Sequence, residues 1–355
     1  MIVIGIDPHK HSHTAVAVAG DTGELLAEIT VPASPHGAER LLSWAHSLGH
    51  ELTFALEDCR HVTRSLERFL IERSQPLVRV PPKLMARQRR AARTRGKSDA
   101  IDALAVARAF LREPTLPAAS LDPGKRELKL LLDHREDLVQ ERTRLQARLR
   151  WHLHELELGA DVPAGALDRD RWLRRIGARL ARAEQDTLVV IAREQLRRIV
   201  ELTRRISQLE RELTTLVRVQ APQLLELPGC GVLSAAKILA ETGRVSRFGS
   251  DGALALHAGV APLDVSSGRQ RRHRLNRSGN RQLNCALHRI AVTQGRVHPP
   301  ARAYLERKQA EGKSRREALR CLKRHLARNV YRTLRAIEEE TTMPTTRPVP
   351  VPALT

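Results

Sequence analysis

Aromatic side chains are scarce in this chain, at 3% of its 355 residues. Proteins that bind single-stranded nucleic acid commonly stack the bases on exposed aromatic rings. So few rings argue against a stacking platform of that kind. If the chain binds nucleic acid, we expect contacts with phosphates to dominate.

Cysteines and long apolar runs are also sparse. The four cysteines, Cys59, Cys230, Cys285 and Cys321, are far apart and form no CxxC pair, which argues against a structural zinc site or a disulfide framework. No apolar run approaches the ~18 residues that a membrane span needs. The first residues, "MIVIGIDPHK", lack the basic lead and long apolar core of a signal peptide. We therefore expect a soluble cytoplasmic protein with no membrane partner.

Acidic residues are outnumbered by basic ones. The chain has 61 lysines and arginines against 40 aspartates and glutamates, a formal net charge of +21, and a pI near 11.1. An excess of this size predicts a polyanionic partner rather than a particular fold. The length is sufficient for two or three domains.

Residues 1–115 predict a mixed α/β domain. The stretches "IVIGID", "HTAVAVAG" and "ELLAEITV" read as three leading strands, and "ELTFALED" and "PLVRV" as two more. Helices are expected at 37–48, 62–73, 83–93 and 98–112. Ribonuclease H has this order of elements, with helices packed on a mixed sheet.

Residues 116–220 predict a long helical spacer. Leucines 145, 149, 153 and 156 recur at helical spacing, and apolar residues at 199, 202, 206, 209, 213 and 216 form a heptad seam. Two long helices joined around 159–168 would make either an antiparallel hairpin or a dimer-forming coiled coil. Residues 221–338 read as a mostly helical domain ending in a basic helix near 315–337, and 339–355 as a disordered tail rich in proline and threonine.

Four acidic residues stand out in this basic chain. Asp99 and Asp102 are three residues apart, so they are neighbours on one face of a helix. Asp7 and Glu57 each end a predicted buried strand, where packing gives no reason for a carboxylate. If the first and fourth strands are adjacent, all four side chains can converge on a site for divalent cations with oxygen ligands. Two Mg²⁺ ions in such a site could support phosphodiester cleavage.

Basic residues surround these carboxylates in the sequence. The segment 83–97 contains seven basic residues and no acid, and we interpret it as a surface for a nucleic-acid backbone. The residues expected to bind there are Arg87, Arg89, Arg90, Arg93, Arg95 and Lys97. The "HKHSH" tract (residues 9–13) resembles a metal tract, but contact with phosphate or RNA, or plain exposure, is favoured over zinc.

Two further motifs lie in the C-terminal third. The turn Pro228-Gly229-Cys230-Gly231 opens a helix, and Gly229 and Gly231 would present backbone N–H groups to a phosphate, as in a helix–hairpin–helix. Cys230 itself reads as a small buried residue.

Ser266 and Ser267 precede seven arginines between Arg269 and Arg289. A serine hydroxyl there could attack a phosphodiester while arginines neutralise the charge that develops. The arginines expected to contact nucleic acid are Arg269, Arg271, Arg272, Arg274 and Arg277.

Asp7, Glu57 and "KSDAIDA" resemble the DEDD acidic set of the insertion-sequence 110 family of transposases. "LPGCG…ETG", "AGVAP…SSG" and "RSGNRQLN" are similar to that family's C-terminal transposase domain. The resemblance follows the family's order over almost the whole chain and leaves out only the tail.

The resemblance implies a fold of class α/β plus α. Its parts would be a ribonuclease H-like (RuvC-like) N-terminal domain similar to junction resolvases, a coiled-coil spacer, and a mostly helical C-terminal transposase domain. It assigns metal binding to Asp7, Glu57, Asp99 and Asp102, with Mg²⁺ or alternatively Mn²⁺, and the nucleophile to Ser267, with Ser266 as the alternative. The family tends to have a glycine-containing turn after the glutamate. Here the chain reads Glu57-Asp58-Cys59-Arg60, so Asp58 remains an alternative ligand.

The implied function is DNA strand cleavage and rejoining through a phosphoserine intermediate, guided by a structured non-coding bridge RNA. The implied partners are DNA at the element ends and target, the guide RNA, and other copies of the chain, as homodimers and a synaptic tetramer. The bacterial nucleoid is the expected location. Two alternatives remain: a metal-only junction-resolving endonuclease without a covalent intermediate, and a non-catalytic nucleic-acid-binding protein.

Overall fold

The computed structural model describes residues 1–91, 98–114, 116, 118–119, 121–265, 273–276 and 279–342. The chain divides into two compact units. The first is Met1–Asp122 together with Ser246–Gly249, and the second is Pro123–Val245 together with the residues from Ser250 onward. In the described part of the chain, no helix combines the length and the apolar character needed to cross a membrane.

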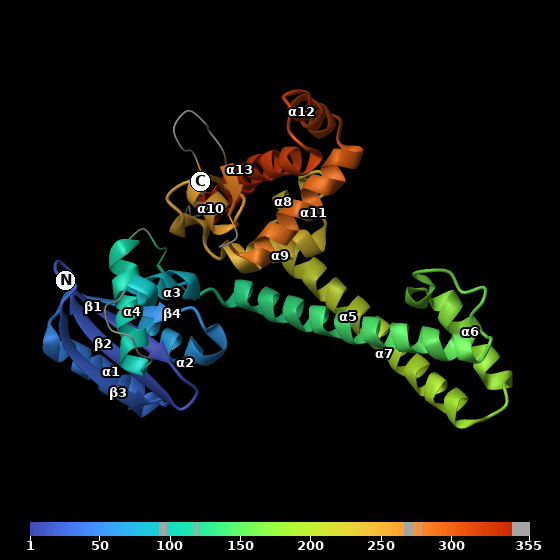
Figure 1. The fold of residues 1–355 in the computed structure, drawn as a ribbon, viewed down its shortest axis with the longest axis horizontal. Helices are drawn as coiled ribbons and strands as arrows, with labels where there is room; N and C mark the ends of the chain where they lie inside the picture. The colour runs from blue at the N-terminus through green and yellow to red at the C-terminus, as the bar shows by residue number, and fades with distance from the viewer. Residues whose placement is uncertain are drawn as a thin grey trace, which may run out of the picture. The chain divides into compact units, whose positions relative to one another are not determined.

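The first unit is built on a five-stranded sheet (Figure 1). Its strands are β1 (Ile2–Pro8), β2 (Ser12–Ala19), β3 (Leu25–Pro32), β4 (Leu52–Glu57) and β5 (Leu77–Val80), in the order β3-β2-β1-β4-β5. The pairs β1–β2 and β2–β3 are antiparallel, whereas β1–β4 and β4–β5 are parallel. This is the predicted ribonuclease H-like arrangement, with the first and fourth strands side by side.

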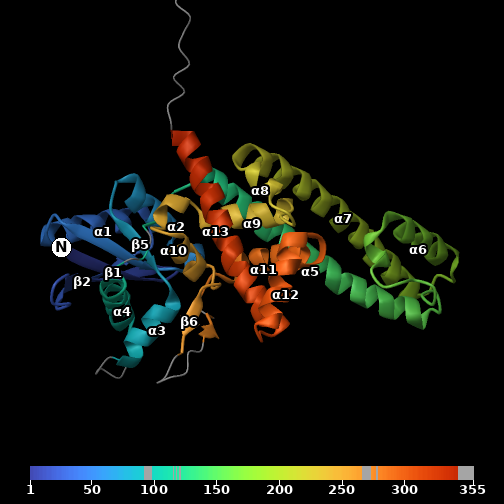
Figure 2. The same cartoon turned by 90° about the horizontal axis from the view of Figure 1, so that it is seen from above.

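Helices cover both faces of this sheet, as Figure 2 shows. Helices α1 (Pro35–Leu48) and α2 (Arg60–Glu72) pack over the apolar cluster that contains Ile4, Ile6 and Phe54. Helices α3 (Pro82–Ala91) and α4 (Asp99–Arg112) lie on the other face, over a cluster that contains Val3 and Ala55. Because successive strand residues point to opposite faces, odd-numbered positions of β1 and β4 face α4.

Gly5 sets how closely α4 approaches the sheet. A Cβ atom at this position would overlap the carbonyl oxygen of Ala103 and lie 2.6 Å from the backbone nitrogen of Ala107. Only glycine therefore allows the backbone of α4 to rest directly on β1. The same contact brings the first turn of α4 towards the end of β1.

The second unit begins with a helical hairpin. Helix α5 (Pro123–Glu155) packs against α7 (Thr187–Gln220), and the 3-10 helix η1 (Ala166–Asp168) and helix α6 (Asp170–Arg182) lie between them in sequence. Arg135 pairs with Glu210 at 2.6 Å, and Arg198 pairs with Glu141 at 2.9 Å. Low-numbered residues of α5 thus meet high-numbered residues of α7, so the two helices are antiparallel. Of the two interpretations of the seam, the hairpin within one chain is the one observed.

Two details of the hairpin differ from the sequence prediction. The apolar seam of α7 is buried from Ile199 to Leu213, but its next buried member is Val217 and not Leu216, which is half-buried. A straight helix has 3.6 residues per turn, so a 3.5-residue seam drifts around it along its length. The prediction also missed α6, whose buried residues Leu173, Ile176 and Leu180 form an apolar stripe against α7.

The rest of the second unit is mostly helical. Its elements are α8 (Gln223–Glu226), α9 (Val232–Thr242), η2 (Val245–Arg247, shared with the first unit), α10 (Asp251–His257), β6 (Pro262–Asp264), β7 (His273–Leu275), α11 (Arg281–Val297), α12 (Pro299–Ala310) and α13 (Arg315–Thr342). Helix α13 continues past residue 339, where the sequence predicts the tail to begin. Residues 343–355 lie outside the described residues.

Buried polar contacts join the hairpin to these later elements. Lys237 of α9 donates to Glu136 of α5 at 3.0 Å. Lys129 of α5 donates to Glu241 of α9 at 2.8 Å, and Asn280, which caps α11, donates to the same carboxylate at 2.6 Å. Glu241 and Lys237 are both buried, so these charges are desolvated but compensated.

Candidate functional site

Asp7 and Glu57 lie at the ends of adjacent parallel strands. The register pairs Ile6 of β1 with Leu56 of β4, so the next residues along the two strands are Asp7 and Glu57. Both occupy the odd-numbered positions that face α4. Asp7 is buried and Glu57 half-buried. The register places these two carboxylates at one edge of the sheet, where the sequence predicts them, and on the same face.

Helix α4 supplies the other two acids from its first turn. Ser98 caps this helix, its hydroxyl accepting a hydrogen bond from the backbone N–H of Ile101 at 3.2 Å. Asp99 follows the cap and is exposed, whereas Asp102 is buried. The positive end of the helix dipole favours both carboxylates there. This local stabilisation offsets the repulsion that the three-residue spacing predicts.

The other three acids of the predicted set all act on the charge of Asp7. Burial, together with the negative charges of Asp102, Glu57 and Asp99, raises the pKa of Asp7 from its ordinary 3.8 to about 6. The charge of His9 opposes this shift. Asp7 Oδ2 is buried and has no hydrogen-bond partner in the described structure. A buried carboxylate oxygen without a hydrogen-bond partner is suited to binding a cation.

His9 also belongs to this cluster, although the sequence favours contact with phosphate or RNA, or plain exposure, for its tract. Its Nδ1 lies 3.7 Å from Asp7 Oδ2, and its Nε2 lies 3.5 Å from Asp99 Oδ1. Ligand atoms of Asp7, His9 and Asp99 all lie within 4.8 Å of one another, close enough to hold one metal ion. The sequence could have predicted this position, because His9 follows Asp7 by two residues and residues i and i+2 of an extended chain share a face.

The three histidines of the "HKHSH" tract have different environments. His9 and His11 are exposed, between β1 and β2, whereas His13 lies within β2 and is buried. Burial lowers the pKa of His13. The three side chains therefore do not form a histidine-only metal tract.

The turn after Glu57 separates the two alternative ligands. Glu57 is among the carboxylates that raise the pKa of Asp7. The backbone N–H of the next residue, Asp58, donates to Val80 O at 3.0 Å. Burial, together with a hydrogen bond to Glu57, raises the pKa of the Cys59 thiol to about 11. Glu57 thus acts on the charge of Asp7, and the choice between Glu57 and Asp58 as the ligand stays a prediction.

The basic segment before α4 is described only in part. Arg87, Arg89 and Arg90 lie in helix α3, but their side chains are outside the described structure. Arg93, Arg95 and Lys97 lie outside the described residues altogether. A nucleic-acid surface on this segment stays a prediction.

The serine-bearing segment connects β6 to β7, which form an antiparallel pair. Ser266, Ser267, Arg269, Arg271 and Arg272 lie outside the described residues, as does Arg277. Arg274 lies in β7 and is exposed. The nucleophile role of Ser267 is therefore still a prediction.

The "RSGNRQLN" motif supports the base of this β6–β7 segment. The side-chain amide of Asn276, directly before the motif, donates to Leu256 O at 3.1 Å, and that of Asn284, its last residue, donates to Ala258 O at 2.9 Å and Gly259 O at 3.1 Å. Gly259 has φ +67° and packs against Gly279. Asn276 and Asn284 thus fix the chain on both sides of the β6–β7 pair.

The turn before α9 places its two glycines differently. Gly229 has φ +79°, and a Cβ atom there would lie 3.0 Å from Thr293 Cβ, so this glycine allows the turn to pack on α11. Gly231 is exposed and directly precedes the helix, and a Cβ atom there would have no neighbouring atom within 4 Å. Cys230 is buried, which raises its pKa to about 12, as expected for an inert thiol. Phosphate binding at this turn stays a prediction.

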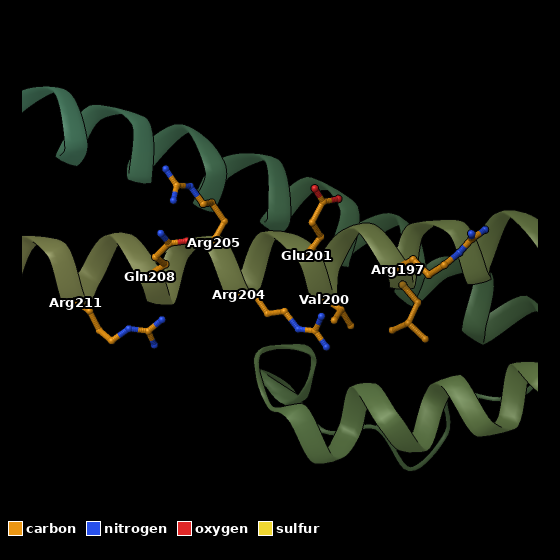
Figure 3. A pocket seen from close by; sticks show the side chains of 8 residues that line it. Arg197, Val200, Glu201, Arg204, Arg205, Gln208 and Arg211 are labelled. Carbon is orange, nitrogen blue, oxygen red and sulfur yellow. The ribbon is translucent and has the colours of Figure 1, made fainter.

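A second basic surface lies on α7, where a groove runs along the helix (Figure 3). Arg197, Arg204 and Arg211 line it at intervals of seven residues, and all three are exposed. Within the described residues, none of these three arginines has an ion pair, whereas the neighbouring Arg205 pairs with Glu212 at 3.8 Å. Exposed cations in a row without acidic partners are suited to phosphates.

Comparison with known proteins places the chain in a family. Residues 4–157 match a family model described as "Transposase", and residues 221–306 match one described as "Transposase IS116/IS110/IS902 family". The "Insertion element IS116 uncharacterized 44.8 kDa protein" of Streptomyces clavuligerus is 29% identical, covering 94% of each chain. The "Insertion element IS900 uncharacterized 42 kDa protein" of Mycobacterium paratuberculosis is 27% identical, covering 93% of this chain and 95% of the relative.

Among solved structures, a Thermus thermophilus RuvC structure is similar at 20% identity, covering 34% of this chain and 100% of that one, with a TM-score of 0.28. The two family models match both units of the chain, and the two insertion-element relatives match it over nearly its full length. The chain belongs to the IS116/IS110/IS902 family of transposases, enzymes that cleave and rejoin DNA.

Proposed function

We propose that this transposase cleaves and rejoins DNA through a covalent phosphoserine intermediate, at a composite site made by the acidic cluster and Ser267. The cluster is Asp7, Glu57, Asp99 and Asp102. The observation that carries the proposal is the placement of Asp7 and Glu57 at the ends of adjacent parallel strands, with ligand atoms of Asp7, His9 and Asp99 within 4.8 Å of one another. Although the protein has a net charge of +21, it keeps these acids close enough for the charges of Asp102, Glu57 and Asp99 to raise the pKa of Asp7.

The donor set of the cluster suits a divalent cation such as Mg²⁺. Carboxylate oxygens are the ligands that this ion prefers. Asp7, Glu57, Asp99 and Asp102 would hold it, and Asp7 contributes the buried Oδ2 atom that has no hydrogen-bond donor. When bound, a divalent ion neutralises charge on a phosphodiester and favours departure of the leaving oxygen.

The chemistry assigned to the chain's own residues is a transesterification. The Ser267 oxygen gains a bond to phosphorus and loses its proton, while the bond from phosphorus to a deoxyribose oxygen breaks and that oxygen gains a proton. The reverse reaction with a hydroxyl from another DNA strand rejoins the backbone without an external energy source. Arg274 and the other arginines around Ser267 would neutralise the charge that develops at phosphorus.

We further propose that a structured non-coding RNA guides the choice of DNA. The resemblance of the sequence to its family supports this, and the excess of basic over aromatic residues favours phosphate-mediated binding of such an RNA. Sequencing of RNA that copurifies with the expressed protein tests the proposal. Recovery of one structured species from the element would support it, and recovery of bulk cellular RNA alone would contradict it.

The test of the chemistry is a covalent adduct. Incubation of the protein with labelled DNA and Mg²⁺ should give a protein–DNA species that survives denaturation, and Ser267→Ala should abolish it while Ser266→Ala retains it. Glu57→Gln should abolish cleavage, whereas Asp58→Asn, the matched change at the adjacent acid, should retain it. Metal-dependent cleavage without any adduct would instead establish a metal-only endonuclease. Absence of both cleavage and adduct would favour a non-catalytic binding protein.

A further inference from the structure

The imidazole ring of His9 lies between two carboxylates of the acidic cluster. Its Nδ1 is 3.7 Å from Asp7 Oδ2, and its Nε2 is 3.5 Å from Asp99 Oδ1. Two ligand atoms on one ion bound at ~2.0–2.2 Å lie ~3–4 Å apart. Each ring nitrogen therefore has the separation from its neighbouring carboxylate oxygen that sharing one ion with that oxygen requires, and one of the two nitrogens can act as the ligand.

The backbone holds His9 in this place before any ion binds. Pro8 precedes it and restricts the chain at the end of β1. The backbone N–H of His9 donates to Ser12 O at 2.8 Å, which closes the turn between β1 and β2. A backbone held in this way limits the conformational entropy that the segment loses on binding a metal.

Asp7 supplies an independent sign that a cation belongs here. Its side chain is only 5% exposed, and its Oδ2 atom has no hydrogen-bond partner in the described structure. This oxygen faces the His9 ring. A buried carboxylate oxygen is costly unless a donor or a cation satisfies it.

We propose that His9 is a nitrogen ligand in the metal site, and that it shifts the site's preference from Mg²⁺ towards later transition-metal dications such as Co²⁺. The inference rests on the proposed function, in that it takes the acidic cluster to bind a divalent ion. An all-carboxylate site favours Mg²⁺, whereas imidazole favours later first-row metals. One ring nitrogen binds the ion, and the other donates its N–H to the remaining carboxylate.

His11 provides a matched control in the same turn. It is exposed, like His9, and lies two residues further along the chain. Within the described residues, the group able to hold a metal contains His9 with Asp7 and Asp99, and not His11. His11→Ala thus removes an exposed imidazole with the same change in composition as His9→Ala.

The experiment measures metal binding by the full chain without DNA. Co²⁺ and Mg²⁺ are titrated into the wild type, His9→Ala, His9→Gln and His11→Ala, with thermal melting as a check on folding. Mn²⁺-loaded samples are examined for ¹⁴N modulation of the electron spin echo. We expect both His9 variants to lose at least about tenfold in Co²⁺ affinity, to change Mg²⁺ affinity by less, and to lose the ¹⁴N signal. His11→Ala should match the wild type.

Other results would overturn the inference. If His9 serves only as an ion-pair partner of Asp7 and Asp99, its removal frees both carboxylates, and the affinities for Co²⁺ and Mg²⁺ rise together. Equal ¹⁴N modulation in the wild type and His9→Ala, or no metal binding by the wild type, would also contradict it. Metal binding through His9 without DNA cleavage would contradict the proposed function alone, and cleavage with unchanged metal binding in His9→Ala would contradict this inference alone.

Discussion

The charge of Asp7 depends strongly on its surroundings. Its pKa of about 6 in the folded chain exceeds the ordinary 3.8, so between these values the folded state retains a proton that the unfolded state has released. The free energy of unfolding contributed by Asp7 therefore falls as the pH rises through this window. Asp7 stabilises the metal-free fold least at neutral pH.

This dependence makes Asp7→Asn stabilising in the absence of metal. The shift of about two units corresponds to up to ~3 kcal/mol at pH 7. At pH 4 and below, where Asp7 is protonated in the folded state, the variant and the wild type should differ little. Denaturant unfolding in a chelator across pH 4–8 measures this, with Asp21→Asn, an exposed acid in a turn, as the control. A stability difference that is the same at every pH would contradict the buried charge of Asp7.

At the same scale, the sequence predicted the four acids but not their histidine. Asp7 and Glu57 stood out because a carboxylate at the end of an apolar strand is unusual, and Asp99 and Asp102 because of their helical spacing. The position of His9 depends on the turn that its N–H closes with Ser12. That turn follows from the pairing of β1 with β2, which a local pattern does not specify.

At the scale of elements, the site depends on the contact between β1 and α4. Gly5→Ala would place a methyl group against the backbone at Ala103 and Ala107. We expect α4 to shift, with a loss of about 1–3 kcal/mol in stability and a loss of metal affinity, because Asp99 and Asp102 move with the helix. Thermal melting and metal titration measure both effects. Gly249→Ala, where a Cβ atom meets nothing within 4 Å, is the matched control. Wild-type metal affinity in Gly5→Ala would contradict this dependence.

The arginines on α7 provide a second prediction at this scale. Residues seven apart on a helix are ~10 Å apart, so Arg197, Arg204 and Arg211 form a row (Figure 3). Changing all three to Gln should weaken DNA binding and lower the slope of log affinity against log salt by up to ~0.9 per lost phosphate contact. The same change at exposed Arg171, Arg174 and Arg182 of α6 should have little effect. Equal slopes in the two triple variants would show that the α7 row does not bind phosphates.

The elements themselves were largely predictable. The five strands and four helices of the first unit appear where short apolar runs and helical periodicity predict them, because turn residues separate them clearly. In the hairpin, the stripe of Leu173, Ile176 and Leu180 was visible at helical spacing but was not recognised as α6. The shift from Leu216 to Val217 required the accumulated twist of a 34-residue helix.

At the scale of the whole molecule, the proposal requires two distant parts of the sequence to act on one phosphodiester. The acidic cluster lies in the first compact unit, and Ser267 belongs to the second, with the hairpin of α5 and α7 between them in sequence. We propose that the cluster of one protomer works with Ser267 of another. Cleavage would then await an assembled complex of several protomers on DNA, which would protect other DNA from stray cuts.

Complementation between inactive variants tests this central claim most directly. Asp102→Asn lacks a member of the cluster, and Ser267→Ala lacks the nucleophile, so each protein alone should fail to cleave. If the site is shared between protomers, a mixture contains some intact sites and recovers partial cleavage, with the covalent adduct only on the Asp102→Asn chain. If the cluster and the serine come from one chain, the mixture stays inactive. An inactive mixture of two folded, DNA-binding variants, or an adduct on the Ser267→Ala chain, would contradict the account.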